Sequence, residues 1–319
     1  MPDLVQFTRH NDIAVITIDN PPVNALNPSV IEGLARALDQ VEQDANTRAA
    51  VLVGAGKTFV AGADIKEFGK ITRGQSRGIE LPALLNRFEA CKTPIVAAIH
   101  GNAFGGGLEV ALACHYRVAA PRSQLGQPEV KLGLIPGAGG TQRLPRIVGL
   151  RKGVEMCAEG NPISAAEALN LGLVDRIVEG DLLSGATAFA TSVADRPAPS
   201  TRERNDKPVS EAEAAAILSA AREAARKKYR NWIAPIAAID GVEASVQLPF
   251  DQALQLERKL FQECLFSDQS KALIHVFFGE REVAKVPDIP KDTPIIPVAS
   301  AADSANSSSM NALPSFGRP

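Results

Sequence analysis

The stretch that decides the fold is Gly101-Asn102-Ala103-Phe104-Gly105-Gly106-Gly107-Leu108-Glu109. It follows a short apolar run at residues 94–99, and its three consecutive glycines lead into a predicted helix that carries Glu109 in its first turns. The first N–H groups of a helix have no partner within the helix, so they can donate to an oxyanion. On spacing alone, the glycines fit such a site and fit a helix packed tightly on a sheet equally well.

Strands and helices alternate on both sides of this stretch. Alternating apolar residues at 13–18 follow the polar turn at 10–12, which predicts a hairpin, and Asn27 before Pro28 is a good helix cap and first position. Continuous apolar runs predict strands that are covered on both faces. The order indicates an α/β fold. The elements expected are a helix at 28–43, strands at 49–53, 94–99, 116–119 and 174–178, and helices at 79–90 and after Gly105.

The chain changes character after about residue 190. Prolines and charges at 194–208 predict a linker or surface crossing, and helical patterns follow at 211–228, 251–266 and 269–281. From 287 onward, proline and then serine dominate, a composition too poor in large apolar groups to fold. We therefore expect an α/β core at 1–190, an all-helical portion at 191–286 and a disordered tail at 287–319.

Composition excludes several classes of protein. Of 319 residues, 45% are apolar and 22% are charged, which is typical of a globular protein with a large core. The net charge of −2 provides no basic field for nucleic acid. Four cysteines without paired spacing predict buried, reduced thiols, and four isolated histidines predict no metal site. Neither a signal peptide nor a membrane span is predicted, so a cytoplasmic location is expected.

Two glycine-rich segments resemble phosphate loops but lack a required residue. The segment at 54–58 ends like a nucleotide-binding loop, yet Val51 stands where that pattern needs its first glycine. The segment at 137–142 begins like a dinucleotide fingerprint, yet Gln142 replaces its third glycine. No Gly-x-Ser-x-Gly elbow offers a serine nucleophile.

Two other segments accompany the triple glycine, namely Phe59-Val60-Ala61-Gly62-Ala63-Asp64-Ile65 and Gly126-Gln127-Pro128-Glu129. Together the three segments resemble the crotonase superfamily, whose members act on acyl-coenzyme A thioesters. The resemblance runs from about Val5 to Asp175, and it implies a spiral of ββα turns. It also implies that the N–H groups of Ala63 and Gly106 form an oxyanion hole for the thioester carbonyl.

Glu109 and Glu129 match the two glutamates of enoyl-CoA hydratases. Adding water to a 2-enoyl thioester needs one proton taken from water and one delivered to the α-carbon, and two carboxyl groups can do both. The resemblance implies that Glu109 activates the water and that Glu129, neutral beforehand, protonates the carbon. Isomerases of the family generally need one such carboxylate, so the retained pair favours hydration over Δ3-to-Δ2 isomerisation.

Coenzyme A is anionic, so its site needs local cations on this nearly neutral chain. Lys57 and Lys66 flank the Ala61–Ile65 turn and are candidates for contacts to the phosphates. The resemblance places the backbone of Ala61, Asp64 and Ile65 beside the adenine. The implied reaction needs no metal or redox cofactor, since coenzyme A is part of the substrate.

The second half of the chain looks like the segment that follows the N-terminal hydratase part of multifunctional fatty-acid β-oxidation enzymes. The matching stretches include Val246-Gln247-Leu248-Pro249-Phe250 and Ala272-Leu273-Ile274-His275-Val276-Phe277-Phe278-Gly279. No dinucleotide loop follows them, so dehydrogenase activity is not predicted. A homo-oligomer is an open alternative, because stand-alone hydratases and multifunctional relatives assemble differently. A further alternative is a scaffold that binds acyl-CoA or RNA without turnover. Acyl-chain length is not readable, although residues 70–92 are expected to help wall the acyl pocket.

Overall fold

The computed structural model describes residues 3–75 and 81–283. The chain divides into two units, residues 1–277 and 278–319, and all the features that follow belong to the first unit, apart from the last residues of helix α12. The predicted boundary after residue 190 stays a prediction. The tail predicted at 287–319 lies outside the described residues, as do the first two residues of the helix predicted at 79–90.

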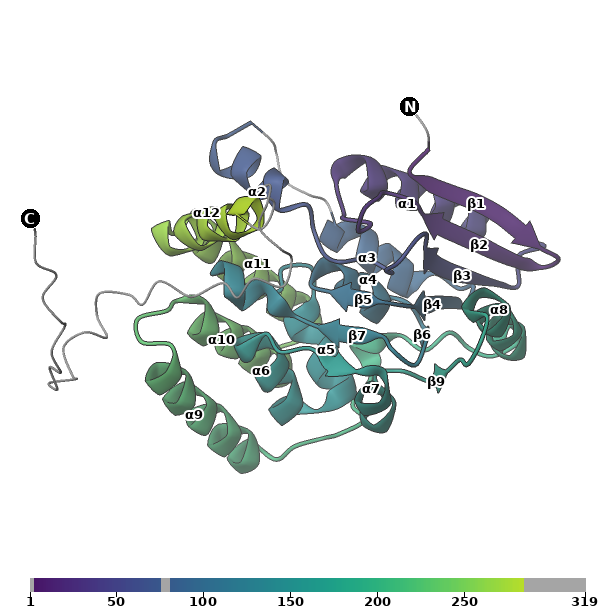
Figure 1. Cartoon of the computed structure of the whole chain (residues 1–319). Coiled ribbons are helices and arrows are strands. Elements are labelled where there is room, and N and C mark those ends of the chain that lie inside the picture. Colours follow the sequence, from purple (N-terminus) through teal and green to yellow (C-terminus); the bar gives the residue numbers. More distant parts are fainter. Residues whose placement is uncertain (1–2, 76–80, 284–319) are drawn as a thin grey trace, which may run out of the picture. The chain divides into compact units, whose positions relative to one another are not determined.

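A six-stranded sheet is built by strands between residues 5 and 177 (Figure 1). Its strand order is β1-β2-β3-β4-β6-β9, and every neighbouring pair is parallel except the β1–β2 hairpin. The predicted hairpin and strands are confirmed, although the last strand is shorter than expected. The strands are β1 (Val5–His10), β2 (Ile13–Ile18), β3 (Ala49–Gly54), β4 (Ile95–Ile99), β6 (Tyr116–Ala119) and β9 (Arg176–Ile177).

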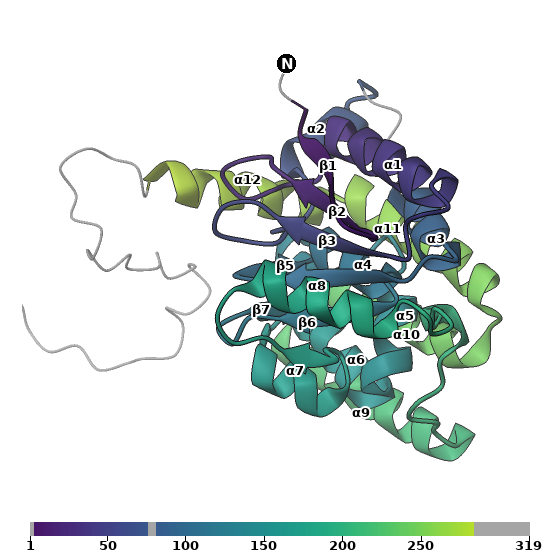
Figure 2. The same ribbon diagram turned by 90° about the vertical axis from the view of Figure 1, so that its right-hand side faces the viewer.

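Helices cover both faces of this sheet, which explains the continuous apolar runs. Helix α8 (Leu182–Val193) lies along β3 and β4, where Val51 packs in one cluster with Phe189 (Figure 2). Helices α1 (Pro28–Gln43) and α3 (Leu81–Ala90) cover the opposite face, where Leu52 packs in the main core with Leu34. Neighbouring strand residues therefore enter different cores, and a polar residue at either position would be buried.

A second, three-stranded sheet positions the segments that carry the site. It consists of β5 (Asn102–Phe104), β7 (Gln124–Gly126) and β8 (Ile163–Ser164), with β5 and β7 parallel. The register pairs Phe104 with Gly126 at the strand ends. Helix α4 (Gly106–Ala113) begins directly after β5, and the 3-10 helix η1 (Pro128–Leu132) begins directly after β7. Because parallel strands end at the same edge, the triple glycine and the Glu129 loop emerge side by side.

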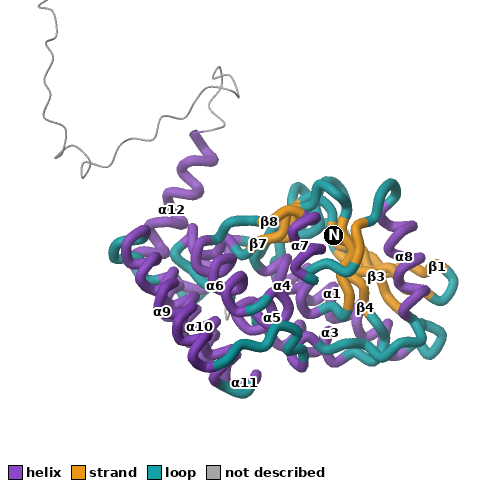
Figure 3. Tube along the Cα trace, turned by 90° about the horizontal axis from the view of Figure 1, so that it is seen from below, coloured by secondary structure: helices purple, strands orange, loops and turns teal. Residues whose placement is uncertain are grey.

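Helices α5, α6, α9, α10 and α11 group together beside the strands (Figure 3), whereas α7 contacts β9 of the larger sheet. The helices predicted at 211–228, 251–266 and 269–281 are confirmed with small shifts at their ends. Helix α10 packs against α5, α6, α9 and α11, and most of its circumference is buried, so its sequence has no clear polar face. The remaining helices are α2 (Ile65–Thr72), α5 (Gly140–Val148), α6 (Leu150–Glu159), α7 (Ala165–Leu171), η2 (Thr201–Glu203), α9 (Glu211–Lys228), α10 (Ala234–Gln247), α11 (Phe250–Phe266) and α12 (Asp268–Val283).

Two further expectations concern cysteines and membranes. All four cysteines are buried and unpaired, as the sequence predicts. Burial raises the pKa of the Cys114 thiol to about 12, so this cysteine is kept as a neutral thiol. None of the helices in the described part of the chain is both long and apolar enough to cross a bilayer.

Candidate active site

Two backbone N–H groups lie side by side at the start of α4. A Cβ atom built on Gly106 would lie 3.5 Å from the backbone nitrogen of Ala63. Ala63 forms an isolated parallel bridge with Leu26. In this bridge the Leu26 N–H donates to the Gly62 oxygen and the Asp64 N–H donates to the Leu26 oxygen, so the Ala63 N–H takes no part. Within residues 3–75 and 81–283, neither the Ala63 nor the Gly106 N–H has an acceptor. Both groups are therefore free to donate to a ligand.

Close contacts explain why three glycines are needed here. Gly105 has a φ of 52°, and a Cβ there would lie 2.7 Å from Oε1 of Glu129. A Cβ on Gly107 would lie 2.1 Å from the backbone oxygen of Val60, closer than any side chain allows. The glycines thus serve both purposes that the sequence left open: they pack α4 onto its neighbours, and they give access to an unpaired N–H group.

The two predicted catalytic glutamates converge from α4 and η1. Glu109 is 3% exposed, and its Oε1 accepts hydrogen bonds from the N–H groups of Ala138 (2.7 Å) and Gly140 (2.8 Å). Glu129 is partly exposed. The amide orientation of Gln127 that satisfies its neighbours lets Nε2 donate to both oxygens of Glu129, at 3.1 and 3.2 Å. A Cβ on Gly140 would touch both the Gln127 amide and the Glu109 carboxylate, so these groups share one small space.

The surroundings of the two glutamates favour different protonation states. Desolvation, and then the charges of Glu109 and Glu257, raise the pKa of Glu129 well above its usual range. Desolvation also raises the pKa of Glu109, but the Ala138 and Gly140 N–H groups and the charge of Arg143 oppose this. Fewer groups oppose the upward shift at Glu129 than at Glu109, so Glu129 keeps its proton more readily and Glu109 ionises more readily. The resemblance implies the same arrangement.

A third buried carboxylate, Glu257 on α11, was missed by the sequence reasoning. It is 1% exposed and accepts hydrogen bonds from the N–H groups of Gly139 (2.6 Å) and Thr141 (2.9 Å) and from the Thr141 hydroxyl. Burial and the charge of Glu109 raise the pKa of Glu257 to about 8. A signal was present in the sequence, because Glu257 occupies the same helical stripe as the buried Ala253 and Cys264.

The segment at 137–142 is not a dinucleotide loop. The N–H groups at positions 138–141 all donate to Glu109 or Glu257, so none of the four is left for a phosphate. Among the residues that the structure describes, no group of three or more His, Cys, Asp or Glu side chains could hold a metal ion. The backbone of the segment at 137–142 therefore binds the side chains of Glu109 and Glu257.

The residues expected to contact coenzyme A surround the Ala63 turn. Lys57 and Lys66 are exposed, on either side of it. Asp64 caps α2, its side chain accepting from the Lys66 N–H at 3.0 Å, and its own N–H donates to Leu26. The Ala61 N–H donates to the backbone oxygen of Val23. The N–H groups of Ala61 and Asp64 therefore already have acceptors within the protein. Ile65 is the first residue of α2. Contacts of this turn with a nucleotide stay a prediction.

Part of the segment expected to wall the acyl pocket lies beside the free amides. Leu81, the first residue of α3, would be 3.6 Å from a Cβ on Gly106. Phe68 on α2 packs edge-on against Phe261 on α11, with ring centroids 5.9 Å apart. Leu81 of α3 thus borders the free amides, while the ring contact joins α2 to α11. Residues 76–80 of the predicted wall lie outside the described residues.

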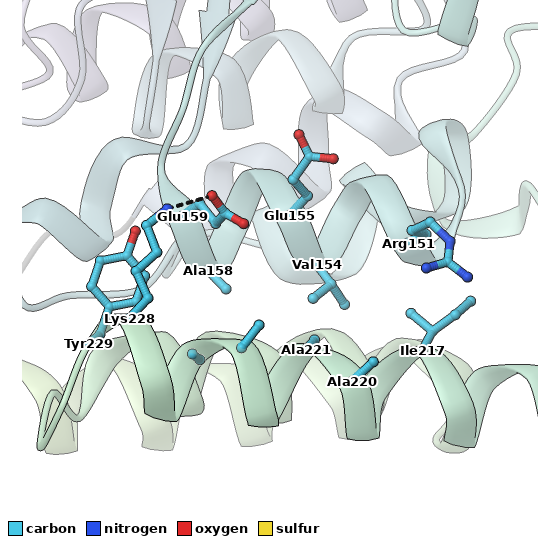
Figure 4. Close-up of a pocket in the computed structure, with 12 residues that line it drawn as sticks. Arg151, Val154, Glu155, Ala158, Glu159, Ile217, Ala220, Ala221, Lys228 and Tyr229 are labelled. Atoms are coloured by element: carbon cyan, nitrogen blue, oxygen red, sulfur yellow. Dashed lines mark hydrogen bonds and ion pairs between the residues drawn. The ribbon is translucent and has the colours of Figure 1, made fainter.

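A separate cavity lies between α6 and α9 (Figure 4). It has a volume of about 280 Å³, and its lining includes Val154, Ala221 and Tyr229. An ion pair between Lys228 and Glu159, at 2.8 Å, closes one end. None of the predicted site residues lines it, so it is distinct from the carboxylate site.

Known proteins resemble this chain over most of its length. A model of the family described as enoyl-CoA hydratase/isomerase matches residues 8–228. The glyoxysomal fatty acid beta-oxidation multifunctional protein MFP-a of Cucumis sativus is 44% identical over 285 residues, which cover 87% of this chain and 39% of that protein. The peroxisomal bifunctional enzyme of Homo sapiens is 39% identical over 283 residues, covering 88% of this chain and 39% of that enzyme. The chain spans about two fifths of the length of these relatives.

A solved structure shares the fold. The crystal structure of an enoyl-CoA hydratase/isomerase from Pseudoalteromonas atlantica superposes with a TM-score of 0.64 at 26% identity. The match covers 87% of this chain and 97% of that one.

Proposed function

Because the chain belongs to the enoyl-CoA hydratase/isomerase family, we propose that it is a 2-trans-enoyl-CoA hydratase that forms 3-hydroxyacyl-CoA in fatty-acid β-oxidation. The observation that carries the proposal is the pair of unpaired N–H groups at Ala63 and Gly106, placed beside two carboxyl groups of different proton affinity. A thioester carbonyl needs the first pair, and addition of water needs the second.

The predictions of fold and family are confirmed. The fold is the expected crotonase-like α/β spiral with C-terminal helices. The relatives are multifunctional β-oxidation proteins, as the second half of the sequence indicates. Since this chain spans only part of them, no dehydrogenase activity is proposed for it.

The proposed reaction begins with binding of the thioester oxygen. The Ala63 and Gly106 N–H groups donate to this oxygen and stabilise the enolate that forms, and each such donor is typically worth about 2.7–4 kcal/mol. Glu109 removes a proton from water, and the hydroxide forms a bond to the β-carbon. Glu129 delivers its proton to the α-carbon as the enolate collapses. Proton exchange between the two carboxyl groups then restores the starting state, with one water added overall.

Isomerisation of 3-enoyl thioesters is the second candidate function. It is favoured by the raised pKa of Glu129, because a raised pKa makes the ionised carboxyl group a stronger base, and one such group can remove one proton and return another. It needs no activated water, and hence no role for Glu109. Turnover of a 3-enoyl thioester without hydration of the 2-enoyl compound would identify this function.

Hydration of crotonyl-CoA, followed by the loss of its conjugated-enoyl absorbance, tests the proposal. We expect 3-hydroxybutyryl-CoA as the product, identified by mass spectrometry. No turnover of 2- or 3-enoyl thioesters of any chain length would reject both enzyme functions. Retention of acyl-CoA or RNA by the same inactive protein would instead support the scaffold alternative.

The proposed chemistry uses coenzyme A only as part of the substrate and requires no metal or redox cofactor. The cytoplasmic location expected from the sequence is not confirmed, since the relatives named above are glyoxysomal and peroxisomal. The proposed function instead assigns the chain to the compartment in which its source cell carries out β-oxidation. Cell fractionation with an antibody to the full chain tests this, and its sedimentation in solution tests whether it forms a homo-oligomer.

A further inference from the structure

We propose that Glu257 is a positioning residue of this active site: it binds alternate N–H groups of the segment at 138–141 and thereby fixes the other two, which hold Glu109. The proposal rests on the proposed function. It assigns a role in the chemistry to the C-terminal helix α11, which carries none of the residues predicted to touch the substrate.

The hydrogen bonds alternate along four consecutive residues. The N–H groups of Ala138 and Gly140 donate to Oε1 of Glu109, at 2.7 and 2.8 Å. The N–H groups of Gly139 and Thr141 donate to Oε1 and Oε2 of Glu257, at 2.6 and 2.9 Å. The segment is therefore held between two carboxylates that come from α4 and α11. A shift of the segment that lengthens one pair of bonds must also disturb the other.

The Thr141 hydroxyl adds direction to this arrangement. It donates to Oε2 of Glu257 and accepts from Nε2 of Gln142 at 2.9 Å. The same Gln142 nitrogen donates to the backbone oxygen of Gly241 on α10 at 2.8 Å. Because the hydroxyl proton points to Glu257, both oxygens of this carboxyl act as acceptors. Three donors thus orient Glu257 in one position, and α5, α10 and α11 share one polar network.

Burial makes this arrangement costly unless each partner is present. Glu257 is 1% exposed, and burial of a polar group is strongly unfavourable without compensating hydrogen bonds. A helix start alone can be capped by a neutral serine or asparagine at much lower cost. A carboxyl group supplies more, because its two oxygens accept from two different N–H groups of the segment, those of Gly139 and Thr141.

The test compares two variants of the full chain. Glu257→Gln keeps the size of the side chain but presents an NH₂ group to one of the N–H donors. Ala253→Gly is the matched control, since Ala253 is a fully buried residue one turn earlier on the same helix and its methyl side chain has no polar atom that could bond to the segment at 138–141. Hydrogen–deuterium exchange of residues 137–142, the Tm, and kcat and KM for crotonyl-CoA are measured for both.

For Glu257→Gln we expect amide exchange in this segment to be at least about 10-fold faster, because its hydrogen bonds open more often. We expect kcat to fall about 10- to 100-fold with KM changed less than about three-fold, since misplacement of Glu109 affects the chemical step. Ala253→Gly lowers the Tm but changes neither the exchange of this segment nor kcat. Unchanged exchange in Glu257→Gln, or equal effects in both variants, would overturn the proposal.

A double variant shows whether Glu257 acts through Glu109. If it does, Glu109→Gln/Glu257→Gln is no slower than Glu109→Gln alone, because the group being positioned is already inactive. Multiplicative losses would contradict this. Should Glu257→Gln not fold, Thr141→Val removes one donor only, and unchanged exchange and kcat in that variant would reject the proposal. If the unaltered chain does not hydrate any enoyl thioester, the proposed function fails, while the exchange data still decide whether Glu257 holds the segment.

Discussion

Gly106 lies so close to Ala63 that a Cβ atom on Gly106 would be 3.5 Å from the Ala63 nitrogen, and both N–H groups lack an acceptor among the described residues. Free backbone donors in an enclosed place are costly unless a ligand binds them. Their proximity depends on two tertiary contacts, the Leu26–Ala63 bridge and the Val60–Ala103 bridge. The pair is therefore a product of the fold as a whole, and its chemistry can be tested with small substitutions.

Gly106→Ala is expected to inactivate the protein without unfolding it. The added methyl group would meet the flexible side chains of Leu26 at 3.2 Å and Leu81 at 3.6 Å, which can move, but it would also enter the space in front of the Ala63 nitrogen. We expect kcat/KM for crotonyl-CoA to fall about 10²- to 10³-fold, the typical effect of losing one oxyanion donor. Gly279→Ala is the control, since no heavy atom lies within 4 Å of its added Cβ. Retained activity in Gly106→Ala would argue against an oxyanion site here.

Glu129→Gln is expected to separate activity from stability. It removes the proton donor, so kcat for hydration should fall about 10²- to 10⁴-fold. The amide resembles the neutral carboxyl group in shape, and it cannot repel Glu109 and Glu257, so the Tm measured by calorimetry should not fall. Glu155→Gln, which alters an exposed carboxylate on α6, is the matched control and should leave both quantities unchanged. A fall in Tm with unchanged kcat would assign Glu129 a structural role.

The pH dependence of stability should reveal the buried carboxyl groups. In the unfolded chain Glu257 ionises near pH 4.5, whereas in the folded protein it keeps its proton up to about pH 8. Between these values the folded state binds more protons, so the free energy of unfolding should decrease as pH rises. Urea denaturation between pH 5 and 8 measures this slope. Glu257→Gln should make the slope shallower, and an identical slope in this variant would contradict the raised pKa.

Glu89 is expected to contribute to stability through a buried ion network. It is 2% exposed at its side chain and pairs with Arg143 at 2.9 Å and with Arg202 at 3.1 Å, which ties α3 to α5 and η2. Glu89→Gln leaves the buried Arg143 without its counter-ion, so we expect a loss of about 3–5 kcal/mol in the free energy of unfolding. Arg36→Gln breaks an exposed pair with Asp3 and should not shift the denaturation midpoint. Equal midpoints for the two variants would contradict this account.

Local patterns in the sequence predict much of the fold. Helix α1 begins at Pro28 as expected because Asn27 caps it, its side chain accepting from the Val30 N–H at 2.9 Å. The strands could be recognised because burial on both faces demands apolar residues at successive positions. In contrast, α10 was not delimited, because a helix that is buried almost all round has no polar face to reveal its period.

The sequence alone also determined which residue types stand at the site: small residues at positions 63 and 106, and carboxylates at 109 and 129. Only the tertiary structure decided which of them meet, which N–H groups stay unpaired, and that Glu257 shares a segment of backbone with Glu109. The physical reason is that hydrogen-bond partners and desolvation depend on residues that are distant along the chain. Spacing specifies a local conformation, whereas the proton affinity of a buried carboxyl group is set by whatever the fold packs around it.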